Sequence, residues 1–492
     1  MKRALTVVFL VSLAVAVSYA QVGKITQQDW VTSRADAQRT SWIRSDAFIS
    51  PESMQKPGFA LRWKATLADR SAPRSALAEG VVFGNLGFGS KPVSFITSRA
   101  NRVFAVDNDT GVVFWQRELE GSIIRTNVCP GGATSAATRP ATLVPVIPSW
   151  RGLPERGAYS SAVSAPGEGV LPYLLERQAA ARAPAPTPAP ASAPPAPPLP
   201  QVVYALSSDG ILHTLGLYSG KDMSRPLPFL PPNARSSDLI AIGNVVYTTT
   251  TSGCGGVADG VWAMDLSSDA HDVKTWKSDA GSLVGRISFG TSGTVFVGSS
   301  NAIVALDPKE LTVRNRFTLT GSTFVTSPVV FTIAEREIVA ATAQDGSVLL
   351  LDAASLALLG RSTVGSRDPR GLATWEDRAG TRWLLATTLR SVLGFKATFV
   401  NGALTLETGW TSQPIGEPLP PIIVNGVAFL VSSDGPPILY ALDAATGREL
   451  WTSGRTIVSP ALRPALWAGI GQVQVATSDN VVYAFGFAME RD

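Results

Sequence analysis

A strand–turn–strand unit repeats along this chain, and the period of the repeat restricts the fold more than any single motif does. In the copy "AFLVSSDGPPILYALDAATGRELW" (428–451), a short apolar strand leads through Asp-Gly to a second strand, and a turn ending in Gly leads to a third. Eight copies align on the middle of the second strand, at Ala105, Thr214, Ala263, Ala305, Leu350, Gly394, Ala441 and Ala484. Six of the seven intervals between these positions lie between 42 and 49 residues.

This period is typical of the four-stranded blades of a β-propeller. The sequence therefore predicts an all-β fold, a single eight-bladed propeller of four-stranded antiparallel blades. The last copy stops at "VVYAFG" (481–486), with no strand after it. Near the start, "FALRWKATL" (59–67) contains Leu-Arg-Trp, which resembles the "RELW" strand of the seventh copy. We expect residues 59–67 to pair with 481–486 as the outermost strand of the last blade and so to close the ring.

The best-preserved copies share a turn motif with a structural role. An Asp can hydrogen-bond the backbone two residues on and so start a turn. A Gly four residues later supplies the positive φ where the next strand begins. The Trp that follows can fill the space between neighbouring blades, which we favour over ligand stacking. The residues of this predicted docking motif are Asp107, Gly111, Trp115, Asp443, Gly447, Trp451 and, from the closing strand, Trp63.

Residues 105–115 and 441–451 both match A-x-D-x-x-T-G-x-x-x-W. This pattern resembles the tryptophan-docking repeat of the quinoprotein, or pyrroloquinoline-quinone-like, β-propellers. The segment 29–67, with its W-x-x-x-x-x-D-x-x-R-T stretch, is similar to the lead-in of such proteins. The rival WD-repeat propellers carry Gly-His and a terminal Trp-Asp, and neither is in register here.

The resemblance implies the fold without implying the enzyme site. Quinoprotein dehydrogenases of this family typically have adjacent cysteines beside the quinone, whereas the two cysteines here are 125 positions apart. Those enzymes also use an Asp base and a Ca²⁺ ion held by carboxylate and amide oxygens, a set that we cannot assign in this sequence. Ligands gathered from distant blades would not be visible in a sequence. We assign no catalytic, cofactor-binding or metal residues and no cofactor, and pyrroloquinoline quinone with calcium stays as the alternative.

The two cysteines are expected to meet on one face of the propeller. Cys129 precedes a predicted innermost strand, and Cys254 lies in the loop between the second and third strands of the following blade. In an up-and-down blade, these two kinds of connection lie on the same face. We therefore predict a Cys129–Cys254 disulfide, which suits an oxidising compartment.

The one long interval, 109 residues, indicates an insertion of roughly 64 residues by the repeat period. We place it at 147–200, within the propeller, and its Pro-rich part at 181–200 is typical of an extended linker. By topology it leaves from the face opposite the cysteines. It is either a tolerated loop insertion or a ligand for a partner that binds Pro-rich segments, and we favour the loop insertion.

The first twenty residues have the pattern of a signal peptide. Lys2 and Arg3 precede an apolar stretch at 6–17, and small residues then indicate cleavage after Ala20. We expect a secreted or periplasmic protein with no transmembrane segment. The domain division is then a signal peptide at 1–20, a lead-in at 21–58 and the propeller at 59–492. The net charge of +4 is small for 492 residues, so we expect no nucleic-acid partner.

No familiar catalytic motif is present. His213 is an ordinary strand residue by its pattern, and His271 lies in a charged turn. Asp209, Asp345 and Asp434 precede Gly in loops of the possible ligand face, where turn chemistry explains them. We interpret the chain as an exported, non-catalytic scaffold that binds a protein or polymer on one propeller face, as a monomer. The alternative, which leaves the question of an enzyme open, is a quinone-dependent alcohol or sugar dehydrogenase with a divergent site.

Overall fold

The computed structural model describes residues 28–67, 77–84, 91–143 and 201–488. The chain divides into two compact units, 1–146 with 201–492, and 147–200. The predicted signal peptide, its cleavage site and the predicted insertion lie outside the described residues.

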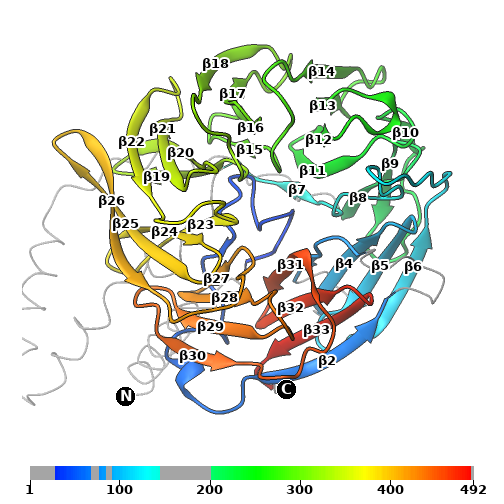
Figure 1. The fold of residues 1–492 in the computed structure, drawn as a ribbon. Helices are drawn as coiled ribbons and strands as arrows, with labels where there is room; N and C mark the ends of the chain where they lie inside the picture. The colour runs from blue at the N-terminus through cyan, green and yellow to red at the C-terminus, as the bar shows by residue number, and fades with distance from the viewer. Residues whose placement is uncertain (1–27, 68–76, 85–90, 144–200, 489–492) are drawn as a thin grey trace, which may run out of the picture. The chain divides into compact units, whose positions relative to one another are not determined.

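Eight antiparallel sheets surround a central channel, as Figure 1 shows. We number the blades 1–8 in chain order. From the channel outward, blades 1 and 2 contain β3 (Val81–Phe83), β4 (Val93–Ser98), β5 (Arg102–Asp107) and β6 (Val113–Glu118), then β8 (Val202–Leu206), β9 (Ile211–Gly216) and β10 (Leu227–Pro228). Blades 3 and 4 contain β7 (Pro140–Ala141), β11 (Ser236–Ile242), β12 (Val245–Thr250), β13 (Gly260–Asp265) and β14 (Val273–Lys277), then β15 (Ser288–Phe289), β16 (Val295–Gly298), β17 (Ala302–Leu306) and β18 (Val313–Thr318).

The second half of the ring follows the same plan. Blades 5 and 6 contain β19 (Val329–Ile333), β20 (Arg336–Thr342), β21 (Ser347–Asp352) and β22 (Leu358–Thr363), then β23 (Gly371–Glu376), β24 (Arg382–Thr387), β25 (Val392–Val400) and β26 (Ala403–Thr411). Blades 7 and 8 contain β1 (Trp42–Ile43), β27 (Ile422–Val424), β28 (Val427–Val431), β29 (Leu439–Asp443) and β30 (Glu449–Thr452), then β31 (Ala461–Gly469), β32 (Gln472–Thr477), β33 (Val481–Gly486) and β2 (Ala60–Thr66). Helical turns among the described residues are short 3₁₀ segments, such as η1 (Ser53–Gln55) and η3 (Cys254–Gly256), and none of the described helices has the length and apolar character to cross a membrane.

The predicted eight-bladed propeller is therefore confirmed. Every position used to align the repeats lies in the strand next to the outermost strand of its blade. Three blades depart from the regular plan at the channel. In blade 2, the innermost position is a single bridge between Thr138 and Tyr204. Blades 3 and 7 each gain a short parallel strand, β7 and β1, inside their innermost strand.

The predicted ring closure is also confirmed. Strand β2 pairs antiparallel with β33, from Ala60 opposite Gly486 to Thr66 opposite Val481. The N-terminal strand thus covers the edge that the end of the chain would otherwise expose. In Figure 1 the dark blue β2 lies beside the red strands of blade 8.

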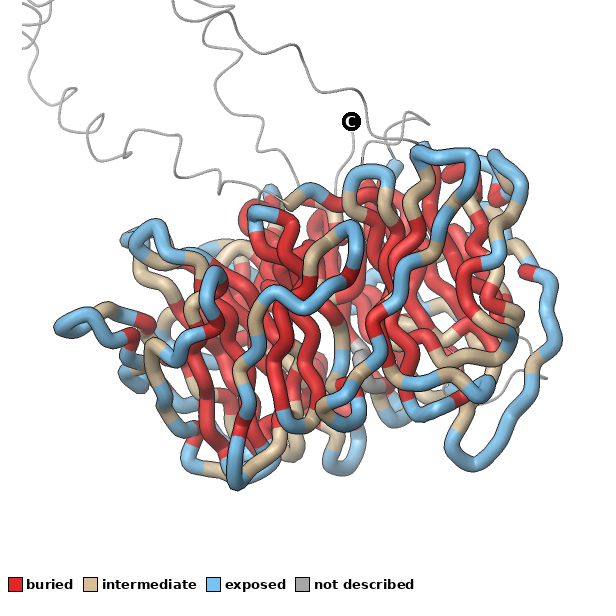
Figure 2. The backbone as a smooth tube through the Cα atoms, turned by 90° about the horizontal axis from the view of Figure 1, so that it is seen from above, coloured by how far each residue is buried: buried red, intermediate tan, exposed pale blue. Residues whose placement is uncertain are grey.

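Apolar burial decreases from the channel outward within each blade. The residues of β4 and β32 are all buried, whereas β6 and β18 on the rim alternate between exposed and half-buried positions. Figure 2 shows the buried positions running through the body of the ring and the exposed ones gathered in turns. Inner strands packed between two blades are covered on both faces, which explains their continuous runs of Val, Ile, Leu and Phe.

The docking motif joins one blade to the next. Asp107 accepts hydrogen bonds from the backbone N–H groups of Asp109 and Thr110, as expected for the start of the turn. Gly111 has φ 75°, and a Cβ there would lie 2.6 Å from the ring of Trp63 in blade 8. The Trp63 indole donates to the Asn108 carbonyl at 2.8 Å. The Trp of the closing strand therefore seats on the turn of blade 1.

The same contact recurs elsewhere and is modified where the turn is missing. Trp115 packs on Gly220 of blade 2, and Trp410 of blade 6 packs on Gly447. Trp451 packs instead against Phe59 and Phe485, at ring-centroid distances of 4.9 and 5.6 Å. Blade 8 has no turn to receive Trp451, because its outermost strand comes from the other end of the chain.

A polar N-terminal segment, residues 28–46, occupies the channel; we call it the plug. Its residues contact the inner part of each blade in blade order, so the segment makes one circuit of the ring. The contacts from blade 1 to blade 8 are Trp30–Val82, Val31–Arg139, Thr32–Leu239, Ala37–Phe289, Gln38–Val330, Thr40–Thr374, Ser41–Ile423 and Asp46–Gly471. Each is a hydrogen bond, and nearly all plug residues are buried. Residues 28–46, which belong to the lead-in predicted at 21–58, are thus an integral part of the ring's interior.

Candidate functional site: an arginine-lined funnel

One face of the ring carries two kinds of loop. The connections into the innermost strands, which we call the inbound connections, lie on the same face as the loops between second and third strands. The turns between first and second strands lie on the opposite face, where Asp29 accepts from Gly84 N–H and Asp46 from Gly471 N–H. The plug therefore reaches the opposite face at these two acids.

Two cavities open on this first face, and together they form the feature that we call the funnel. Pocket A, of about 430 Å³, is lined by the inbound connections of blades 4–7 and by Arg34 and Arg39 of the plug. Pocket B, of about 550 Å³, is lined by the inbound connections of blades 8 and 1–4. Both pockets include Gly285 and Arg286. All eight blades thus contribute to the funnel, and Arg286 lies where its two halves meet.

The charged residues that line the funnel are mainly basic. They are Arg34, Arg39, Arg99, Arg235, Arg286 and Arg370, with the acids Glu79 and Asp368. Two further acids, Asp238 and Glu417, pair with lining arginines from outside the pockets. Even with these included, the six arginines exceed the four acids. A concave site with this excess attracts anions.

At the floor, Arg39 is fully engaged. Its guanidinium lies 2.7 Å from Asp238, and both side chains are almost completely buried. It also donates to the carbonyls of Ile287 and Ser33. Burial lowers the pKa of Arg39 and raises the pKa of Asp238, and in each case the partner's charge opposes the shift. This ion pair fixes the plug to blade 3.

Beside this ion pair, the Glu79 carboxylate accepts three hydrogen bonds. The donors are the Trp30 indole, the Arg34 backbone N–H and the Arg286 guanidinium, at 3.3, 2.7 and 3.2 Å. Glu79 is 1% exposed, so a buried carboxylate here needs these partners. The network ties the plug, blade 1 and blade 4 together under the point where the two pockets meet.

The Arg34 side chain extends along pocket A from the plug. It donates to the Leu372 carbonyl at 3.0 Å and remains half-buried. The pKa of Arg34 is lowered to about 10, chiefly by burial; the charge of Glu79 opposes this shift, and the charges of Arg286 and Arg39 add to it. Like charges held this close favour the approach of an anion.

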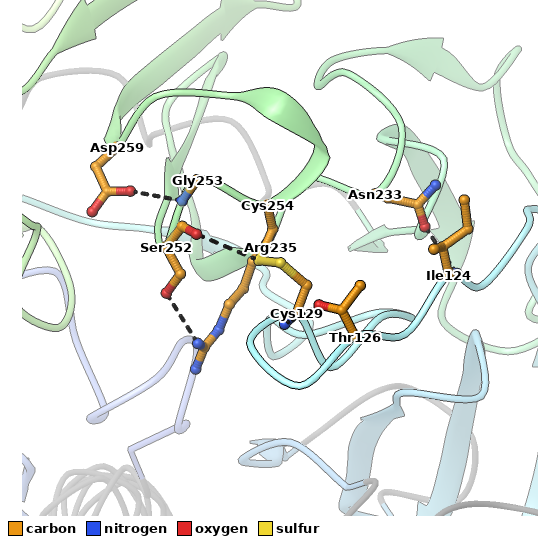
Figure 3. Close-up of a disulfide and its surroundings, with 9 residues drawn as sticks. All are labelled: Ile124, Thr126, Cys129, Asn233, Arg235, Ser252, Gly253, Cys254 and Asp259. Carbon is orange, nitrogen blue, oxygen red and sulfur yellow. Dashed lines mark hydrogen bonds between the residues drawn. A yellow bond between two sulfur atoms is a disulfide. The ribbon is translucent and has the colours of Figure 1, made fainter.

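The rim of pocket B contains the disulfide. The structure joins Cys129 to Cys254, so the predicted disulfide is present, between the connection into blade 2 and a loop of blade 3 (Figure 3). Pro130, next to Cys129, lines pocket B. Arg235, also in the lining, donates to the Ser252 hydroxyl at 3.2 Å. The disulfide therefore joins two loops beside the wall of pocket B.

The residues weighed as candidates in the sequence lie outside the funnel. His213 is buried in β9, with Nδ1 2.9 Å from Asp222. Asp209 accepts from the Ser122 N–H, and Asp345 pairs with Arg361. Asp434 and His271 also lie outside both pocket linings. The residues that do form the funnel floor, Arg34, Arg39, Glu79, Asp238 and Arg286, were not identified. The only sequence signal for them was the Arg-Thr of the lead-in pattern, at 39–40.

The funnel does not fit a calcium-bound quinone. Calcium prefers six to eight oxygen ligands. Glu79 and Asp238 each face arginine, and the described residues contain no group of three or more His, Cys, Asp or Glu side chains that could hold a metal. The cysteines are bonded to each other across 125 positions, so they form no ring of adjacent residues. The arginines suit acidic groups, whereas the carboxylates beside them in the described part of the chain are engaged by those arginines.

No protein-family model matches the chain, and no curated protein matches it. Solved structures match its fold. Quinohemoprotein alcohol dehydrogenase from Comamonas testosteroni is 14% identical, with a TM-score of 0.58 over 94% of this chain and 82% of that one. A europium-containing methanol dehydrogenase is 12% identical, with a TM-score of 0.56 over 94% and 98%. The computationally designed Ika8 protein is 10% identical, with a TM-score of 0.53 over 86% and 98%. Similarity at this level of identity shows the fold alone.

Proposed function

We propose that this protein is an exported, non-catalytic β-propeller that binds an acidic protein or polymer in its funnel. The observation that carries the proposal is the described lining of the two pockets, whose six arginines exceed the four acids that line the pockets or pair with these arginines. Guanidinium groups pair with carboxylates in planar, two-point geometry, which suits an acidic ligand. The disulfide, at the rim of the same face, is consistent with an oxidising compartment.

The test is binding of the purified chain, residues 21–492, to immobilised poly-L-glutamate and poly-L-lysine over a range of salt concentrations. We expect binding to poly-L-glutamate that weakens as salt rises, because added ions screen the funnel's charge. Equal binding to both polymers, or binding to neither, would contradict the proposal.

The second candidate is a quinone-dependent oxidoreductase, which is favoured by the fold similarity to alcohol and methanol dehydrogenases. The purified chain is incubated with pyrroloquinoline quinone and Ca²⁺, and quinone absorbance and alcohol- or sugar-dependent dye reduction are measured. The mismatch in calcium ligands leads us to expect neither signal. Cofactor uptake with dye reduction would refute the scaffold proposal and support the enzyme.

A further inference from the structure

The backbone at Arg34 is unusual for a charged residue. Arg34 has φ 64° and Arg39 has φ 61°, in the left-handed region that Gly and Asn adopt more readily. Non-Gly residues in this region cluster at functional sites, where a required side chain outweighs the local strain. Arg39 has a structural reason to be Arg, since it neutralises the buried Asp238. Arg34 needs a different explanation.

The contacts of Arg34 with the fold depend mainly on its backbone. Its N–H donates to Glu79, a bond that any residue other than Pro would make. Among the described residues, its guanidinium, with five N–H donors, donates only to the Leu372 carbonyl. Arg34 also lines pocket A, so this lightly bonded guanidinium borders the cavity.

Arg286 extends the same donor surface into pocket B. Its Nη2 donates to Glu79 at 3.2 Å, and its buried Nε has no partner among the described residues. Glu79 therefore holds both arginines in place, one through the Arg34 backbone and one through the Arg286 guanidinium. The acid acts as a positioning residue beneath the pair.

Part of the lining of pocket A is apolar. Val325, Val329, Leu419 and Pro420 line the pocket with Arg34 and Arg286, together with the polar Thr326 and Ser327 and the charged Asp368 and Arg370. A ligand that fills it needs an anionic group and an adjoining apolar group. Polypeptides that mix acidic and aliphatic residues offer both, whereas polyphosphate and sulfated sugars offer charge without the apolar part.

We propose that Arg34 and Arg286 form the anchoring subsite for a carboxylate of an acidic polypeptide ligand, with a neighbouring aliphatic side chain of the ligand against the walls of pocket A. This inference rests on the proposed function and names its ligand class and its main contact. The carboxylate would receive donors from Arg34 on one side and Arg286 on the other, at the point where the two pockets meet.

The test uses Arg34→Gly, because Gly relieves the left-handed strain and keeps the N–H bond to Glu79. The matched control is Ala35→Gly, at the neighbouring left-handed residue with φ 79°. A charge control is Arg336→Gln, a half-exposed arginine outside the funnel. The probe is a labelled peptide of repeating Glu-Leu-Ser-Gly units, with a Gln-Leu-Ser-Gly peptide as its uncharged counterpart.

We expect Arg34→Gly to raise the Kd for the Glu peptide at least about tenfold, with a melting temperature no lower than that of the wild type. Ala35→Gly and Arg336→Gln should leave the Kd within about twofold. Unchanged binding by Arg34→Gly would overturn the subsite. A melting temperature lowered by more than about 5 °C in that variant would make Arg34 a structural residue and would also overturn it.

Polyphosphate and the Gln peptide separate the remaining outcomes. Polyphosphate that binds as tightly as the Glu peptide, and competes with it, would overturn the polypeptide as the ligand class. Equal binding of the Gln and Glu peptides would remove the role of the carboxylate. If the wild type binds none of the peptides, polyphosphate or poly-L-glutamate, the proposed function itself fails. If the wild type binds the Glu peptide and Arg34→Gly binds it equally well, only the subsite fails.

Discussion

The blades and the plug are stabilised by different interactions within the same ring. Blades bury continuous apolar strands, and their contacts are repeated around the ring. The plug buries polar and charged side chains, among them Thr32, Asp36, Arg39, Ser41, Arg44 and Asp46. Some of these side chains depend on one particular partner, either on a blade, as Arg39 does on Asp238, or within the plug, as Arg44 does on Asp36.

The difference explains where variation is tolerated. Apolar burial is non-directional, so a blade can lose part of its motif and keep its place. In blades 4 and 5 the docking Gly is replaced by Leu311 and Leu356, which keep the turn with φ 53° and 56° and are buried. A buried polar partner cannot be exchanged so freely, because its counterpart would remain unsatisfied.

Removing residues 59–67 should have the largest effect, because it removes β2 and opens the ring. The edge of β33 is then exposed, and the seat of Trp63 on blade 1 is lost. We expect the melting temperature of the whole propeller to fall by more than about 10 °C, or the cooperative transition to disappear, as measured by circular dichroism. A deletion within 181–200 is the control, and it should change little if that stretch is a linker. Unchanged thermal stability without 59–67 would refute closure as a global constraint.

Asp238→Ala tests the plug directly, since it leaves Arg39 buried without its partner. We expect the free energy of unfolding to fall by about 3–5 kcal/mol in denaturant titrations. Asp345→Ala breaks the ion pair with Arg361, both of whose side chains are more than a third exposed, and should cost about 1 kcal/mol or less. Equal losses for the two variants would remove the distinction between plug and blade surface.

Gly111→Ala tests the contact between blades 8 and 1. The new Cβ would lie 2.6 Å from the Trp63 ring at a residue with φ 75°. We expect a loss of about 2–3 kcal/mol in the free energy of unfolding. Gly243→Ala separates strain from contact, because Gly243 also has positive φ but no atom within 4 Å of the added Cβ. This control should cost about 1 kcal/mol, and an equal cost at both sites would mean that the Trp63 contact contributes nothing.

Asp29→Asn should give the smallest effect, and the effect should depend on pH. Burial raises the pKa of Asp29 to about 6, against the opposing Gly84 N–H and Arg139. A raised carboxyl pKa means that the folded state binds the proton more tightly, so this contribution is complete below about pH 4 and is lost as pH rises through about 6. Between those values the wild type should lose about 1 kcal/mol relative to Asp29→Asn, since the Asp29 side chain is 27% exposed and partly screened. Parallel stability profiles for the two proteins would show that Asp29 keeps an ordinary pKa.

The ring could be predicted from the sequence because its determinants are repeated and local. The period gave the number of blades, and the unfinished last copy indicated the closing strand. The disulfide followed from which loops share a face. The single bridge of blade 2 and the added strands β7 and β1 were not predicted, because two-residue contacts at the channel leave no periodic pattern.

The plug and the funnel could not be predicted for a physical reason. A polar, non-periodic stretch such as 28–46 has the pattern of a surface loop. Its charged side chains are buried only because they pair with residues far along the chain, and the local sequence does not show these partners. Arg39 meets Asp238 across 199 positions, and Arg286 meets Glu79 across 207. The sequence around either residue of such a pair does not indicate that the residue is buried.

The circuit of the plug has a consequence for the order of folding. Trp30 can pair with blade 1 early, but Asp46 reaches Gly471 across 425 positions, and β2 needs the final strand of the chain. Residues 28–67 therefore reach their last partners only after blade 8 has been made. Contacts of such separation form slowly. A chain that stops before blade 8 would leave Asp46 of the plug without its partner and β2 without a sheet. We therefore expect chains that lack blade 8 not to form a stable ring.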